Sequence, residues 1–170
     1  QKILMQMNVN LDEIRDKRTN LNAQEIGDDR ERAKQWKRFD RNPVFERAEL
    51  DRMVKNGVTA LNNMQCSDGG WGWFSGWGER SWPHTTAVVV HGLQIAQQND
   101  VALVPGVLEK GISWLSQYQA EQLERIRNAP AQKDPWKDHA DALDAYVYMV
   151  LVDAGMDNVD MKEFLYRDRN

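Results

Sequence analysis

Three histidines and one cysteine are among the side chains of this sequence that could bind a metal or act as a nucleophile. His84 and His91 are seven residues apart, which is roughly 10 Å if both lie on one helix. That separation is too long for both to bind one metal ion, so we predict no metal site. Cys66 is the single cysteine and cannot form a disulfide within the chain, so it does not distinguish a reducing from an oxidising compartment.

Three aspartates, Asp138, Asp141 and Asp144, recur at every third position. A tight aspartate cluster in an aromatic-lined cavity can protonate an alkene or ionise an allylic diphosphate, which is the chemistry of terpenoid cyclases. The sequence contains neither an Asp-x-Asp-Asp run nor a set of zinc ligands, and acids are favoured near a helix N-terminus in any case. We therefore predict that the chain is not an enzyme and has no cofactor, and a terpenoid cyclase-like fragment is the alternative.

The stretch from Met64 to Thr86 holds four of the seven tryptophans and five of the eleven glycines. Such aromatic residues can line a pocket, contact a sugar or a peptide, or fill a turn between helices. We favour packing, against this chain or against neighbouring domains. The alternative is an exposed platform that anchors a peptide or a glycan. The residues of this contact loop are Trp73, Phe74, Trp77 and Trp82.

The elements that position these residues are predicted to be helices. Apolar residues recur at spacings of three and four, and no run alternates as a half-buried strand would. One helix is predicted to start on Asp138 as its N-cap and to end on Gly155 as its C-cap. The chain is thus predicted to be all-α, with about six to seven helices. The clearest segments are residues 45–64, 85–98, 104–128 and 138–155, followed by a last helix from Val159.

The first part of the chain differs from the rest in its charge. Residues 12–41 are rich in charged side chains and sustain no apolar stripe, which indicates a solvated helical arm. Pro43 then disfavours a helical conformation for the residue before it. We predict an arm at residues 1–41, continuing from an upstream helix, and a helical domain at residues 42–170.

An internal repeat links two of the predicted helices. Residues 57–65 and 111–119 align without a gap, Gly57 with Gly111 and Gln65 with Gln119. Each copy is predicted to close a long helix, and a shorter helix separates the two. The repeating unit is therefore predicted to be a pair of helices.

The first copy of the repeat continues into the pattern Gln65, Gly69, Trp71. This pattern resembles the QW motif of α/α-toroid proteins, which include triterpene cyclases, protein prenyltransferase β-subunits and the thioester domains of the α2-macroglobulin and complement family. A glutamine in the last helical turn can hydrogen-bond backbone groups at the start of the next helix, and the tryptophan packs over the junction. The residues predicted to build this structural motif are Gly57, Gln65, Gly69, Trp71, Gly111, Trp114 and Gln119.

The order of the motifs is similar to that of one of these families, the bacterial α2-macroglobulin-like proteins. Residues 68–74, 81–93 and 106–115 follow one another as that family's turn, helix start and later helix do. The resemblance covers roughly residues 42–155. It implies a partial α/α-toroid built of helix pairs, in a bacterial protein located outside the cytoplasm, in the periplasm, the cell envelope or the medium.

The resemblance also implies a function, as a piece of the thioester-type domain of a broad-spectrum endopeptidase inhibitor. In such a protease trap a proteinase cuts a bait region, and the exposed Cys–Gln thioester acylates the attacker. The family's Cys-x-Glu-Gln motif is missing from this chain, and no glutamine stands three positions after Cys66. We therefore expect a structural or target-contact role without a thioester. Some thioester domains use a histidine to take over the acyl group, but for His139 we favour a helix-start position.

The expected partners follow from the same resemblance: the other domains of a parent protein and the proteinases that it traps. A full toroid needs more helix pairs than this chain supplies, so uncovered apolar faces are expected to cause self-association or loose packing at the C-terminal edge. The net charge of −4 leaves no basic excess for nucleic acid, and the apolar runs are too short to cross a membrane. The sequence starts at Gln1 without a signal-peptide pattern, so we expect a fragment of a longer protein.

Overall fold

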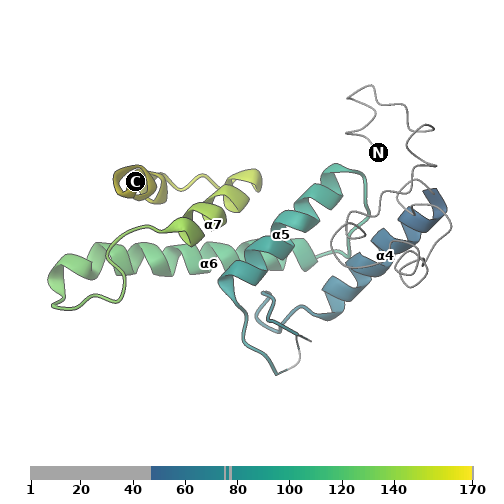
Figure 1. Ribbon diagram of the computed structural model, residues 1–170, viewed down its shortest axis with the longest axis horizontal. Coiled ribbons are helices and arrows are strands. Elements are labelled where there is room, and N and C mark those ends of the chain that lie inside the picture. Colours follow the sequence, from purple (N-terminus) through teal and green to yellow (C-terminus); the bar gives the residue numbers. More distant parts are fainter. Residues whose placement is uncertain (1–46, 75, 77, 170) are drawn as a thin grey trace, which may run out of the picture. The chain divides into compact units, whose positions relative to one another are not determined.

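The computed structural model describes residues 47–74, 76 and 78–169 (Figure 1). The predicted arm at residues 1–41 and the predicted boundary beside it lie outside the described residues. The chain divides into two compact units, residues 1–56 and 57–170, and every described helix except the first part of α4 lies in the second unit.

The described residues form helices and no strand, which confirms the all-α prediction for this part of the chain. The partial toroid and the full number of helices stay predictions. The described α-helices are α4 (Arg47–Asn63), α5 (Pro83–Gln98), α6 (Val107–Asn128), α7 (Ala142–Asp153) and α8 (Val159–Asp168), with the 3-10 helix η3 (Ala129–Ala131) directly after α6.

Helix starts follow from local chemistry. Pro83 is the first residue of α5, where the missing N–H of proline costs nothing because that group has no partner within a helix. Gly106 precedes α6 with φ at 82°, a left-handed conformation that glycine adopts without strain. Asn158 caps α8 by accepting a hydrogen bond from the N–H of Met161 at 3.1 Å. Helix α5 therefore starts at Pro83, slightly before the predicted residue 85, and α6 starts at Val107, slightly after the predicted residue 104.

The prediction that Asp138 caps α7 is wrong, because the cap is Asp141. The Asp141 carboxylate accepts the N–H groups of Leu143 and Asp144, and Asp144 reaches back to the N–H of Asp141 at 2.9 Å. This reciprocal capping box satisfies backbone donors that have no partner inside the helix. At the other end, Gly155 adopts φ 80° one residue after the C-cap, as helix-ending glycines do.

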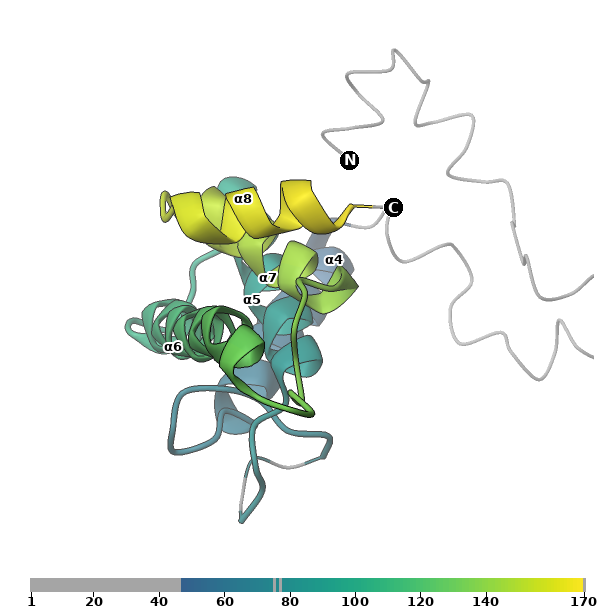
Figure 2. The same ribbon diagram turned by 90° about the vertical axis from the view of Figure 1, so that its left-hand side faces the viewer.

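The core of the second unit lies where α5, α6 and α7 meet. Figure 1 shows α5 and α7 against α6, and Figure 2 looks along α6 and shows α8 running crosswise to it. A smaller cluster joins the end of α6 to α8 through Leu123, Ile126, Ala140 and Met161. The main core is formed by Trp71, Ala87, Val90, Leu93, Val107, Leu108, Leu115, Val147, Val150 and Leu151.

Apolar residues recur along α4 at spacings of three and four, which predicts a broad buried face, but the structure does not show one. None of its residues is buried: one apolar stripe, Leu50, Val54, Val58 and Leu61, is half-buried, while Met53, Gly57 and Ala60 of a neighbouring stripe are exposed. Leu61 joins it to the main core. None of the helices within the described ranges has the length and apolar character needed to span a bilayer.

Candidate functional site

The junction between α4 and α6 is built around Trp71, which is 2% exposed. Its indole Nε1 donates to the carbonyl of Leu61 at 2.8 Å, and its backbone N–H donates to Thr86 Oγ1 at 2.9 Å. The ring also lies against Gly111 of α6, where an added Cβ would come within 2.8 Å of Trp71 Cζ3. Trp71 therefore contacts the end of α4, the start of α5 and the start of α6, and its buried ring fills the junction between these helices.

Gln65 connects the same turn to α6. Its side-chain amide donates to the carbonyls of Gly69 and Val107, both at 2.9 Å. Val107 is the first residue of α6, so the glutamine reaches past α5, and the prediction that it bonds the start of the next helix is wrong. Gly69 adopts φ 95°, and a Cβ there would lie 2.9 Å from the carbonyl oxygen of Lys110. Any other residue at this position would be strained and would push the turn away from α6.

The second copy of the repeat does not build a second junction. Gln119 lies inside α6, which continues to Asn128, so the prediction that each copy closes a helix is wrong for this one. Its side chain is buried, and its Nε2 has no hydrogen-bond partner among the described residues. The physical reason is that no glycine and tryptophan follow Gln119 to form a turn. Gly57 and Gly111 differ too, since Gly57 is exposed with open space around it.

Asp68 organises the turn, a role that the sequence analysis missed. Its Oδ1 accepts from Ser81 Oγ at 2.6 Å and from the N–H of Gly70 at 3.2 Å, and its Oδ2 accepts from Trp114 Nε1 at 2.9 Å. Partial burial alone would raise the pKa of Asp68, but the hydrogen bonds from Ser81, Trp114 and Gly70 outweigh it and lower that pKa. The Asp-Gly-Gly run was the available signal, because aspartate often accepts the N–H two residues ahead.

The second half of the Trp-rich stretch is exposed. Trp73 is 66% exposed, Phe74 80% and Trp82 41%, and Trp77 lies outside the described residues. The Trp73 and Trp82 rings meet edge to face with centroids 6.3 Å apart, and the Arg80 guanidinium lies 4.8 Å from the centroid of Trp82. These three aromatic residues are thus presented to solvent and do not fill the core of this chain.

The aspartates at every third position do not form a shared acidic centre. Asp141 and Asp144 both bind Lys137, whose Nζ lies 2.7 Å and 2.6 Å from their carboxylate oxygens, while Asp138 contacts His139 at 2.6 Å. The side chain of Lys137 is 7% exposed and that of Asp144 is fully buried. Burial favours the neutral amine, but the hydrogen bonds that Lys137 donates to the two aspartates, together with their negative charges, outweigh it and raise the pKa of Lys137.

The carboxylates of Asp141 and Asp144 also change the pKa of Tyr118 in α6. Burial of its phenol and the nearby carboxylates of Asp144 and Asp141 raise the pKa of Tyr118 to about 12. It therefore stays protonated at neutral pH and cannot act as a base. Its ring stacks on Trp114, with centroids 6.0 Å apart.

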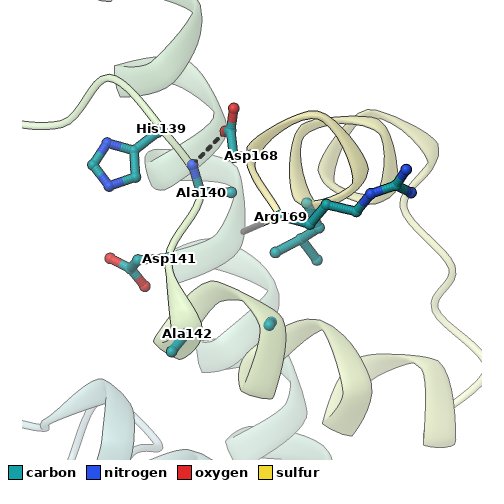
Figure 3. Close-up of a pocket in the computed structure, with 8 residues that line it drawn as sticks. His139, Ala140, Asp141, Ala142, Asp168 and Arg169 are labelled. Atoms are coloured by element: carbon teal, nitrogen blue, oxygen red, sulfur yellow. Dashed lines mark hydrogen bonds between the residues drawn. The ribbon is translucent and has the colours of Figure 1, made fainter.

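A pocket of about 630 Å³ lies between the start of α7 and the end of α8 (Figure 3). Its apolar side is formed by alanines and Leu165. Asp168 Oδ2 is engaged by the N–H of Ala140 at 2.7 Å, and His139 and Arg169 lie at opposite sides in the close-up. The polar groups do not converge on one point, so the pocket has no constellation for acid–base or nucleophilic chemistry.

The remaining candidate residues, His84, His91 and Cys66, pack against other side chains or lie buried in a turn. His84 and His91 each lie 6.2 Å from the ring of Tyr146, measured between centroids, and His91 Nδ1 is 3.9 Å from Asp153. Cys66 is a buried free thiol in the Gln65–Trp71 turn. Within the described ranges no three His, Cys, Asp or Glu side chains gather closely enough to hold a metal ion.

Comparisons with known protein families, with curated proteins and with solved structures find no match for this chain.

Proposed function

We propose that this chain is part of the thioester-type domain of an α2-macroglobulin-like protease trap, with a structural and target-contact role and no thioester of its own. The parent protein would bind and acylate proteinases outside the cytoplasm. This chain would hold neighbouring helix pairs in place and present a contact loop.

The observation that carries the proposal is the junction at Gln65, Gly69 and Trp71. The residues that resemble a QW motif are also the ones that join the end of α4 to α6, through the Gln65 amide at Val107 and the Trp71 ring at Gly111. Contacts that join helices are what the resemblance implies for these residues. That agreement supports a toroid-type helix pair.

Two further observations agree with a role outside catalysis. Cys66 is buried in the turn and is followed by no Glu-Gln pair, so it offers no acylating group. The terpenoid cyclase alternative needs free aspartates in a cavity, whereas Asp141 and Asp144 are engaged by Lys137 and by the first N–H groups of α7.

The test uses the whole protein from which this chain comes. Intact protein in molar excess should slow the cleavage of casein by trypsin and form covalent conjugates with trypsin that survive a denaturing gel. The matched control is the same protein cut beforehand by trypsin that was then inactivated, which should no longer inhibit. Unchanged casein cleavage in the presence of intact protein would contradict the proposal.

A further inference from the structure

The exposed aromatic residues between α4 and α5 form a surface whose use the proposed function does not specify. We call Trp73, Phe74, Trp82 and Arg80 the aromatic patch. Its three rings are each more than a third exposed, and two of them touch. Single exposed apolar residues are ordinary, but a contiguous aromatic group rimmed by a charge is typical of an interaction site.

The loop that carries the patch is held in place by hydrogen bonds at its base. The N–H of Trp82 donates to the carbonyl of Trp71 at 2.9 Å, and Ser81 donates to Asp68. Inside the loop, Glu79 Oε2 accepts the N–H groups of Phe74 and Gly76, both at 3.2 Å. Described residues that such hydrogen bonds hold before binding lose less conformational entropy when a ligand arrives.

The ring geometry argues against a sugar platform. The planes of Trp73 and Trp82 meet at 72°, so they do not present one flat face along which successive sugar rings could stack. Edge-to-face rings leave instead a corner that accepts a single apolar side chain, in the way aromatic residues anchor protein interfaces.

Arg80 supplies the charge of the patch. It stacks on Trp82, and none of the ion pairs formed between described residues involves it. The neighbouring Glu79 carboxylate is turned toward backbone N–H groups of the loop. A guanidinium on an aromatic face keeps its N–H donors for a carboxylate, with which it can form two parallel hydrogen bonds.

We propose that the aromatic patch is a docking surface for an extended protein segment that carries an acidic side chain beside an apolar one. The apolar side chain packs in the corner between Trp73 and Trp82, and the acidic side chain pairs with Arg80. This inference does not rest on the protease-trap proposal, because it concerns only the chemistry of the bound segment.

The test uses the full chain and a short fluorescein-labelled peptide in which glutamate alternates with leucine. Fluorescence anisotropy should show saturable binding, and Trp73→Ala and Arg80→Glu should each weaken it about tenfold or more. The chain offers a matched control in Trp136, which is 81% exposed in the loop before α7 and has Arg125 of α6 at 4.6 Å from its ring centroid. Trp136→Ala and Arg125→Glu should leave the affinity unchanged.

Several outcomes would overturn the proposal. These are no saturable binding, equal binding of a matched peptide with lysine in place of glutamate, and equal losses in the control variants. Patch-dependent binding of cello-oligosaccharides or of anionic lipid vesicles in place of the peptide would identify a glycan or a membrane surface instead. Loss of self-association in Arg80→Glu, followed by sedimentation, would identify a second copy of the chain as the occupant. Circular dichroism checks that each variant is folded, and Arg80→Glu at an exposed site remains informative if Trp73→Ala is not.

Discussion

Replacing Gly111 by alanine tests whether the buried junction is packed as tightly as its geometry indicates. An added Cβ would lie 2.7 Å from Val90 Cγ2 and 2.8 Å from Trp71 Cζ3, and both neighbours are buried side chains of the main core. Overpacking of such a site costs about 3 kcal/mol, at the upper end of the usual range, because neither neighbour is flexible. Alanine regains about 1 kcal/mol through its higher helix propensity. The free energy of unfolding should therefore fall by about 2 kcal/mol.

The repeat provides the matched control, since Gly57 occupies the equivalent position in α4 with nothing within 4 Å of an added Cβ. Gly57→Ala should raise the free energy of unfolding by about 0.5–1 kcal/mol, because only the propensity gain applies. Thermal unfolding followed by circular dichroism measures both, and Gly111→Ala should lower Tm by about 4–8 °C. A Gly111→Ala protein as stable as the parent chain, or an equal loss in Gly57→Ala, would refute the packing at this junction.

Three further predictions concern the charges and the aromatic residues. Lys137→Met should lower the free energy of unfolding by about 3 kcal/mol in urea titrations, because it leaves the buried Asp144 carboxylate without its cation, and adding Asp144→Asn, which removes the charge but keeps an acceptor for the N–H of Asp141, should restore most of the loss. A stability that does not change in the single variant would contradict the buried pair. Because the folded-state pKa of Asp68 is lowered, its contribution is present above the ordinary pKa of 3.8 and is lost as pH falls through the lower folded value. Asp68→Ala should therefore lower stability at pH 7 and reduce the loss of stability on acidification, and an identical pH profile would argue against this network. Iodide should quench tryptophan emission less in Trp73→Phe than in the parent chain, whereas Trp71→Phe should leave the quenchable emission unchanged; the reverse result would mean that the loop is packed.

Much of the local structure is predictable from the sequence, because helix spacing and capping depend on residues three or four positions apart. The predicted helices at residues 85–98 and 104–128, and the last one from Val159, correspond to α5, α6 and α8. The errors arise where two residues of one type compete for a role. Asp141 caps α7 in place of Asp138, because only Asp141 has Asp144 three positions later to complete the capping box.

The candidate site was predictable in part. The Gln65, Gly69 and Trp71 pattern marked the junction, but the apolar stripe of α4 did not reveal that the helix has no buried residue. Asp68 was missed because two of its three partners, Ser81 and Trp114, lie far along the chain. A pairwise contact of that kind leaves no periodic trace in the sequence.

The sequence by itself determined the helical class, the approximate ends of most helices and the tight turn between α4 and α5, because these depend on backbone preferences of neighbouring residues. Only the tertiary structure decided which of several equal residues became buried. Trp71 lies in the core while Trp73 faces solvent, and Gly111 is enclosed while Gly57 is open. The physical reason is that burial depends on which distant elements cover a residue: α5 and α6 pack over Trp71, while Val90 of α5 and the Trp71 ring cover Gly111.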